Sequence, residues 1–345
     1  MSARLGIISG MGLGEALRLK INHPTAKTLM IVLVFSAIFI GNTAYEAGNI
    51  SGARMGIELM FRTENVNPAL INSLMGTIVA FLLFVGNYAV LERFFILVVL
   101  LMSFAFIMTA MITKPDISEM TKGLLIPGIP QKSWFTIIGL IGTTIVPYNL
   151  FLHASLVSKK WNGAATLPGV RKDLIYSIIL GGLISMSIVM SGAALGKAGA
   201  DSFNALASGL EPLFGGYAGT FFGIGLFAAG ITSTITAPLA AAIAVRGIMG
   251  WNNDHTDIRY RLVWIFVLGT GITFASMGYK PIFVIRFAQF ANGLLLPLIA
   301  GFLIWIVNSR TIMGEYANQK IHNIAGGIVL LVSIGLGIKS VTSVF

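Results

Sequence analysis

Long apolar stretches alternate with short polar ones along almost the whole chain. A helix of about 20 apolar residues crosses the bilayer core of roughly 30 Å, and such stretches recur nine times. The predicted spans cover 28–50, 70–88, 91–112, 134–157, 173–196, 213–247, 262–279, 283–307 and 323–343. Stretch 213–247 is longer than one crossing needs, so we expect part of it to lie outside the bilayer. Membrane barrels instead show alternating segments of about ten residues, so this pattern predicts helices.

Composition supports the same class of protein. Hydrophobic residues make up 56% of the 345 residues and charged residues 10%, against roughly 25% charged in a soluble domain. The mean hydropathy is +0.86. We therefore predict an all-α, multi-pass integral membrane protein of the plasma membrane. It would form one transmembrane domain over residues 1–345, with no soluble domain of useful size.

The net charge of +10 is spread over short loops and forms no single patch, which favours a role in topology over nucleic-acid binding. With the N-terminus in the cytoplasm, 14 of the 23 Lys and Arg residues lie on the inner side. They are Arg4, Arg18, Lys20, Lys27, Arg93, Lys159, Lys160, Arg171, Lys172, Arg246, Arg259, Arg261, Arg310 and Lys320. This bias predicts a cytoplasmic N-terminus and an external C-terminus. The chain has no cysteine, which excludes a disulfide framework and thiolate metal ligands.

The stretch "TTIVPYNLFLHASL", residues 143–156, breaks the apolar pattern inside a predicted span. A proline there removes a backbone donor and frees carbonyls of the preceding turn. Secondary transporters use such discontinuous helices to coordinate cations at the bilayer midplane. The carbonyls affected by Pro147 include those of Thr143 and Thr144, and Asn149 and His153, four residues apart, share one helix face. An ordinary proline kink with interfacial polar residues is the alternative interpretation.

Four segments together resemble the NRAMP family of divalent metal transporters, across essentially the whole chain. They are "SARLGIISGMGLGEALR", "NYAVLER", "GTTIVPYNLFLHASLVSK" and "FAAGITSTITAP". The resemblance implies helices two, partial over 1–12, to eleven of a LeuT-type inverted-repeat bundle. It also implies secondary transport of divalent cations of the Mn, Fe and Mg class by alternating access. The implied substrates are a divalent metal ion and, in a symport, protons; we expect no cofactor, no enzyme activity and no obligate protein partner.

The family's first helix, with its Asp-Pro-Gly-Asn break and metal-binding carboxylate and amide, has no match in this sequence. We expect either that the gene start is assigned too far downstream or that the chain is a fragment; pairing with another polypeptide is a third explanation. An in-frame extension upstream of Met1 would then encode the missing helix. On this view we expect the 345-residue chain alone not to transport.

The break itself also departs from the family, with Val-Pro-Tyr-Asn in place of Met-Pro-His-Asn. Val146 supplies no thioether, the soft ligand that favours soft transition metals, and Tyr148 is a poorer ligand than imidazole. We therefore expect a harder ion site than is usual in the family, as in a relative that resembles its magnesium-transporting branch or in a manganese carrier with relaxed selectivity.

Other polar residues within the spans are candidates for the ion or proton path, since ionisable groups at such depth are by default functional. Asn42, Glu46 and Asn49 recur at i, i+4 and i+7 on one face. The resemblance matches Glu46 to the first of two acidic residues on a proton route and finds Asn49 in place of the second, which predicts weak proton coupling. A buried strut in which Glu46 pairs with Arg54 or Arg261 is the alternative.

The resemblance implies a metal site formed by Thr143, Thr144, Val146, Asn149 and Gln289. It implies a proton or water path along Glu46, Asn49, His153, Arg259 and Arg261, although positive-inside anchoring alone would also explain the two arginines. Two rival functions stay open. One is an amino-acid permease of the same fold, and the other is an inactive remnant that lacks helix one.

Overall fold

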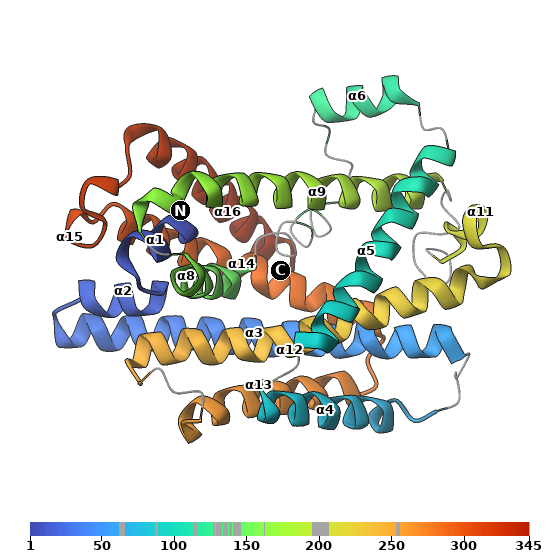
Figure 1. Cartoon of the computed structure of the whole chain (residues 1–345), viewed down its shortest axis with the longest axis horizontal. Helices are drawn as coiled ribbons and strands as arrows, with labels where there is room; N and C mark the ends of the chain where they lie inside the picture. The colour runs from blue at the N-terminus through green and yellow to red at the C-terminus, as the bar shows by residue number, and fades with distance from the viewer. Residues whose placement is uncertain are drawn as a thin grey trace. The chain divides into compact units, whose positions relative to one another are not determined.

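The structure is a computed structural model of the chain, and it describes residues 1–61, 66–86, 89–113, 116–126, 128, 133, 137, 140, 146–161, 163–194, 207–252 and 256–344 (Figure 1). The helices are α1 (Ser2–Ser9), α2 (Leu13–Lys20), α3 (Pro24–Phe61), α4 (Pro68–Val85), α5 (Ala89–Ile112), α6 (Ile117–Leu125), α8 (Pro147–Lys160), α9 (Leu167–Ala194), α11 (Glu211–Phe214), α12 (Ala218–Met249), α13 (Ile258–Ser276), α14 (Pro281–Val307), α15 (Arg310–Met313) and α16 (Lys320–Val344). No strand occurs in these ranges. The all-helical class predicted from the apolar pattern is confirmed.

Seven helices within the described ranges are long and apolar enough to cross a membrane. They lie at the predicted spans 28–50, 70–88, 91–112, 173–196, 213–247, 262–279 and 283–307. α16 lies at the ninth predicted span and contributes an apolar stretch over Lys320–Gly335. Most of the first half of span 134–157 lies outside the described residues. α3 and α12 contain 38 and 32 residues and so exceed one crossing.

The partial helix predicted over residues 1–12 is α1, which ends at Ser9. Gly10 stops it with φ 67 and ψ 8, a left-handed conformation that glycine adopts without a steric penalty. α2 begins three residues later, and the Glu15 carboxylate accepts a hydrogen bond from the Gly12 amide at 3.2 Å. The chain therefore makes a sharp, capped turn before α3.

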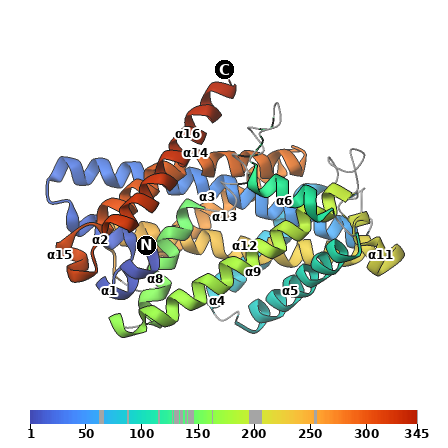
Figure 2. The same cartoon turned by 90° about the horizontal axis from the view of Figure 1, so that it is seen from above.

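The described residues form two compact units, and the boundary between them falls inside α3 after Gly48 and inside α12 after Thr234. The first unit holds α1, α2, α8, α13, α14 and α16 with the first part of α3 and the last part of α12. Within it, α1 lies beside α8 and α14 beside α16 (Figures 1 and 2). The Ser2 hydroxyl donates to the Leu150 carbonyl at 2.5 Å, so α1 and α8 are joined by a hydrogen bond as well as by packing.

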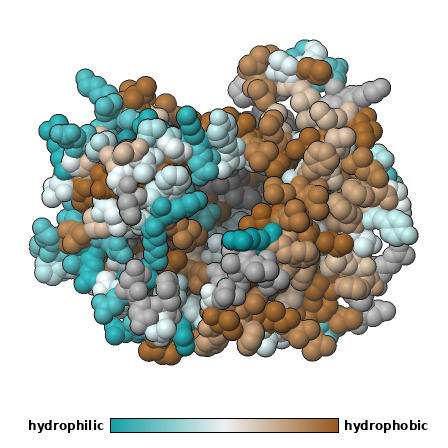
Figure 3. Space-filling view, in the orientation of Figure 1, coloured by the Kyte–Doolittle hydropathy of each residue, from teal (hydrophilic) through white to brown (hydrophobic). Residues whose placement is uncertain are grey.

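The second unit holds α4, α5, α6, α11 and most of α9 with the remaining parts of α3 and α12. Hydrophobic side chains gather over α5 (Figure 3). Exposed apolar residues recur along it every three or four positions at Phe94, Leu97, Leu101 and Phe104, and Met111 lies two turns further on. An apolar stripe of this kind is stable when the solvent is lipid. It indicates a lipid-facing surface.

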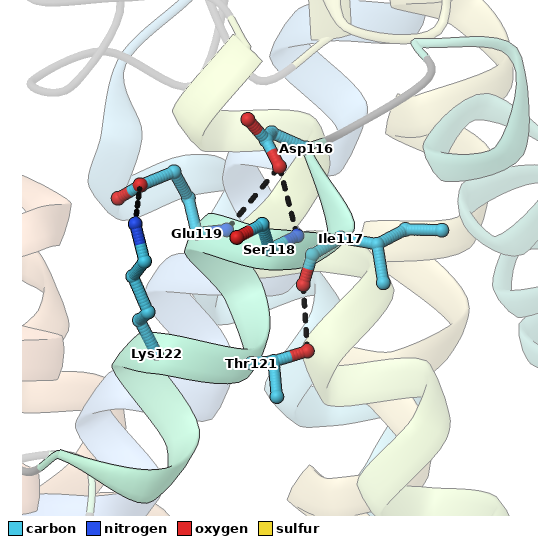
Figure 4. Close-up of polar contacts among 6 residues, drawn as sticks. All are labelled: Asp116, Ile117, Ser118, Glu119, Thr121 and Lys122. Atoms are coloured by element: carbon cyan, nitrogen blue, oxygen red, sulfur yellow. Dashed lines mark hydrogen bonds and ion pairs between the residues drawn. The ribbon is translucent and has the colours of Figure 1, made fainter.

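Short α6 belongs to the second unit and is exposed throughout. Asp116 caps its first turn by accepting hydrogen bonds from the amides of Ser118 at 2.8 Å and Glu119 at 3.3 Å (Figure 4). Lys122 pairs with Glu119 at 2.8 Å, and the Thr121 hydroxyl donates to the Ile117 carbonyl. These local contacts account for a stable polar helix between predicted spans.

Basic residues meet in the first unit at the end that the charge pattern predicts to be cytoplasmic. Arg18 of α2 donates to the carbonyl of Met249 at 2.5 Å. Partial desolvation lowers the pKa of the Lys159 ammonium group at the end of α8, and the nearby Arg246 guanidinium lowers this pKa further, whereas the Glu15 carboxylate opposes the shift. Arg18 thus contributes to the fold as well as to topology.

Candidate functional site: the break before α8

α8 begins at Pro147, the residue at which the sequence predicts a break. Val146 precedes it in an extended conformation, with φ −80 and ψ 126, and its carbonyl accepts a hydrogen bond from the Asn149 amide at 3.0 Å. Proline suits the first helical position because the missing N–H would have no intrahelical partner there. Residues 141–145, which precede Val146, lie outside the described part of the chain.

The break is buried within the first unit. Val146 and Tyr148 are 3% and 5% exposed, and they form a cluster with Ala237 and Ala240 of α12. Tyr45 and Leu152 pack against this cluster. Non-helical backbone occurs at membrane depth only where protein buries it or where it lines a cavity. Protein buries the non-helical backbone at Val146, so its position fits this rule.

Glu46 is fully buried on α3, in the same unit as the break. One turn earlier, Asn42 is 1% exposed and donates from Nδ2 to the Ile38 carbonyl at 2.8 Å. Glu46 faces Gly271 of α13 so closely that a Cβ at Gly271 would lie 2.5 Å from its Cγ. Glycine at this position therefore gives the Glu46 side chain the space it occupies.

Tyr45 connects these features, and sequence reasoning did not single it out. Its ring packs against the cluster at the break and also against a second cluster, formed by Ala44, Ala288 and Ala291. The ring centroids of Tyr45 and Tyr148 are 5.7 Å apart with an interplanar angle of 69°, an edge-to-face pair. A bulky aromatic residue directly before a buried acid was the signal that could have identified it.

The family model "Natural resistance-associated macrophage protein-like" matches residues 1–343. The chain belongs to the NRAMP family. Among curated NRAMP relatives, it is 25% identical to the divalent metal cation transporter MntH of Yersinia enterocolitica, over 97% of this chain and 81% of that protein. It is 24% identical to MntH of Klebsiella pneumoniae, over 97% of this chain and 80% of that protein.

Solved structures agree on the fold. The manganese transporter of Eremococcus coleocola, in a mutant form, superposes with a TM-score of 0.78 at 19% identity, over 99% of this chain and 76% of that one. A complex of that transporter with an aromatic bis-isothiourea substituted compound superposes with a TM-score of 0.77. The predicted LeuT-type NRAMP fold is thereby confirmed, together with the multi-pass membrane class.

Of the predicted metal-site residues of this NRAMP protein, Val146 and Asn149 lie at the break itself. Val146 contributes a buried apolar side chain, whereas the Asn149 side chain is exposed on the first turn of α8. Thr143 and Thr144 lie outside the described residues. Gln289 lies on α14 directly after the buried Ala288, and only its backbone is described.

The predicted path residues are more widely spread. His153 is half-buried one turn beyond Asn149, and Asn49 is half-buried in the part of α3 that belongs to the second unit. Arg259 and Arg261 lie on the first turn of α13. Gly271, which faces Glu46, lies 12 residues after Arg259 on α13, about 18 Å along the helix axis. The structure therefore places both arginines several turns along α13 from the position that Glu46 faces.

Two of the arginines considered above form ion pairs with residues nearby in sequence. Arg259 is exposed, its Nε lies 3.6 Å from Asp257 Oδ1, and its guanidinium lies 5.8 Å from the Trp251 ring centroid. Arg54, the proposed partner of Glu46 in a buried strut, pairs with Glu58 of its own helix at 2.9 Å. Both pairs are local in sequence.

A groove of about 580 Å³ lies in the first unit between α3, α13 and α14, and Ala44 of the cluster beside Tyr45 is one of its lining residues. Its walls are mainly aromatic and aliphatic, and its threonine pair, Thr43 and Thr270, is joined by a hydrogen bond of 3.2 Å. Such walls supply little ligation for a cation. In the described part of the chain, no three His, Asp or Glu side chains converge on one point. The groups at the break that can supply ligand atoms to a cation are therefore backbone carbonyl oxygens and the side-chain amide oxygen of Asn149.

Proposed function

We propose that this NRAMP family protein moves divalent metal ions across the membrane by alternating access, and that the ion passes the break before α8. The observation that carries the proposal is the extended, buried Val146 directly before Pro147. A backbone interrupted in this way can offer carbonyl oxygen to a cation. The printed names of the relatives, a divalent metal cation transporter and a manganese transporter, support the same cargo.

The arrangement favours hard cations. Val146 has no donor atom in its side chain, so the ligands available at the break are oxygen atoms, which suit Mg²⁺ and Mn²⁺. We infer that the cargo belongs to the Mn, Fe and Mg class and that selectivity against Mg²⁺ and Ca²⁺ is weak. An amino-acid permease is the second candidate, since the N-terminus of α8 at the break suits a carboxylate, but the printed names of the relatives favour a metal cation.

Uptake of Mn²⁺ into proteoliposomes tests the function, using the chain together with any in-frame segment that its gene encodes upstream of Met1. We expect Mn²⁺ uptake that excess Mg²⁺ reduces. Pro147→Ala should slow uptake because alanine allows the helix to continue back through Val146. Pro68→Ala is the matched control, since Pro68 also begins a helix. Amino-acid uptake without Mn²⁺ uptake would favour the permease.

Selectivity at the break can be tested at Val146. Val146→Met adds a thioether, so the preference for Cd²⁺ over Mn²⁺ should rise by up to about tenfold, which corresponds to about 1.4 kcal/mol. Val157→Met, at another buried position of α8, is the control and should change the uptake of neither ion. If Mg²⁺ and Ca²⁺ leave Mn²⁺ uptake untouched and Val146→Met has no effect, Val146 only packs and the hard-site proposal is wrong.

Proton movement is a separate part of the proposal. Glu46 is buried near the break, but Asn49 stands where the family resemblance leads us to expect a second carboxylate. We therefore expect weak or absent metal-driven proton uptake. A pH dye inside the proteoliposomes measures it. Clear metal-dependent acidification that is lost in Glu46→Gln would contradict weak coupling without affecting the proposal of metal transport.

A further inference from the structure

Tyr45 occupies the space between three helices of the first unit. Its ring contacts the buried residues at the start of α8 and on α12, and it also contacts buried residues on α14. Apart from Val146 and Tyr148, every member of the two clusters is alanine: Ala44, Ala237, Ala240, Ala288 and Ala291. Tyr45 is thus one of three large side chains, with Tyr148 and Leu152, in surroundings that consist mainly of alanine methyl groups.

Methyl groups cannot close over the space that a tyrosine ring leaves. Protein interiors are packed to crystal-like density, and the loss of a large buried side chain leaves a cavity when its neighbours collapse only in part. The five alanines have no rotamers with which to fill the gap. The rings of Tyr45 and Tyr148 therefore determine whether the region between α8 and α14 is filled or open.

The two rings also hold the start of α8 against α3. Tyr148 directly follows Pro147, so its edge-to-face contact with Tyr45 fixes the first turn after the break. An aromatic pair of this geometry shifts an equilibrium by up to about tenfold beyond the effect of buried area. Separation of the rings is therefore an accessible motion.

We propose that the Tyr45–Tyr148 ring pair closes the ion path between the first turn of α8 and α14, so that a divalent cation passes only when the rings separate. The inference rests on the proposed transport function. Asn149 lies on the first turn of α8 and Gln289 lies beside Ala288 on α14, so the pair stands between the elements that carry two of the predicted ligands. Tyr45 acts here as a positioning residue and ligates no ion.

Thiol accessibility tests this closure, and the chain suits the method because it has no cysteine of its own. Ala291→Cys puts one thiol in the cluster that Tyr45 covers, at a position that is 7% exposed. A charged, membrane-impermeant methanethiosulfonate should modify it slowly. Adding Tyr45→Ala should raise the modification rate by about tenfold, and adding Tyr45→Phe, which keeps the ring, should leave the rate low.

Phe39→Ala is the matched control. Phe39 lies on the same helix, and its ring contacts Phe35 at 4.3 Å and Phe266 at 5.0 Å between centroids but is not among the side chains that pack against either alanine cluster. The Phe39→Ala substitution should leave the modification rate of the thiol at position 291 unchanged. If Tyr45→Ala does not yield folded protein, Tyr45→Leu serves in its place, because leucine keeps much of the volume but removes the ring pair, and the rate should still rise.

Two results would overturn the closure: an unchanged rate in Tyr45→Ala or Tyr45→Leu, or an equal rise in Phe39→Ala, which would mean general loosening of the fold. Mn²⁺ uptake in the same vesicles separates this inference from the proposed function. If the parent protein does not take up Mn²⁺ but its modification rate depends on the Tyr45 ring, metal transport is refuted, and the ring pair is shown only to seal this region of the protein. Mn²⁺ uptake together with a thiol modification rate that does not depend on the Tyr45 ring would refute the closure alone.

Discussion

The part of α3 before Gly48 and the part after it pack against their neighbours in opposite ways. In the first unit, the Tyr45 ring fills a space lined by alanines. In the second unit, α3 meets α12 through glycines: a Cβ on Gly56 would lie 2.5 Å from the Phe227 amide nitrogen and 2.6 Å from the Gly223 carbonyl oxygen. Gly230 faces Ala53 at similarly short range.

This difference separates a rigid contact from an adjustable one. Where two backbones touch, as at Gly56 and Gly223, no side chain can change rotamer to accommodate movement, and small residues are what allow helices to approach this closely in membranes. A ring such as Tyr45 can rotate or withdraw without moving its helix. We infer that the part of α3 after Gly48 packs stiffly and that the Tyr45 side of the part before it is suited to rearrange during transport.

The largest effect is expected from breaking the glycine contact. Gly56→Ala forces two backbones apart, because neither contacting atom belongs to a flexible side chain. We expect a loss of stability of about 1–3 kcal/mol, as for overpacked cores, seen as a lower thermal unfolding midpoint in detergent. Gly52→Ala, one turn earlier, has nothing within 4 Å and should be neutral or slightly stabilising. Equal midpoints for the two variants would contradict the rigid contact.

A smaller effect is expected in the first unit, at the glycine that faces Glu46. In Gly271→Ala the new methyl group would lie 2.5 Å from Glu46 Cγ and 2.8 Å from Glu46 Cβ, so the whole Glu46 side chain must shift, whereas the nearest backbone atom, the Ala47 nitrogen, is 3.3 Å away. We expect a drop of about tenfold in Mn²⁺ uptake, equivalent to about 1.4 kcal/mol, with little change in the unfolding midpoint. Gly269→Ala, with nothing within 4 Å, is the control. Normal uptake by Gly271→Ala would remove Glu46 from the ion path.

The same comparison shows what the sequence could predict. Apolar stretches located the helices because the bilayer requires about 20 apolar residues per crossing, and Pro147 located the start of α8 because proline lacks the amide that an interior helical position uses. The spacing of Asn42 and Glu46 predicted a shared face, and both are buried. These features depend on local sequence alone.

Features that depend on contacts between distant segments were not predicted. Tyr45 looked like one apolar residue among many, since its partners on α12 and α14 lie far away in sequence. A buried strut between Glu46 and Arg54 or Arg261 stays a prediction, while the ion pair described for Arg54 is a local one, with Glu58 one turn along. Helix periodicity shows which residues share a face, but it does not show which residue of another helix that face meets.

The smallest loss of stability is expected at a cluster of asparagine side chains in the first unit. Asn323 of α16 accepts hydrogen bonds at Oδ1 from Asn308 at 2.9 Å and from Asn318 at 2.7 Å, and it donates to Asn308 at 2.7 Å. Arg4 of α1 donates to Asn318. Since α1 packs on α8, this cluster connects the helix that follows the break to the loop between α14 and α16.

If the first unit rearranges during transport, the hydrogen bonds of this asparagine cluster must break. We therefore expect them to contribute little to stability. Asn323→Ala removes three hydrogen bonds, each worth about 0.5–1.5 kcal/mol when buried, but the asparagines are largely exposed and water replaces much of each bond. We expect the unfolding midpoint to fall less than in Gly56→Ala. Gln319→Ala, an exposed amide of the same loop, should leave it unchanged. A fall as large as that of Gly56→Ala would show that the first unit is held as stiffly as the second, and the contrast between the two halves of α3 would no longer stand.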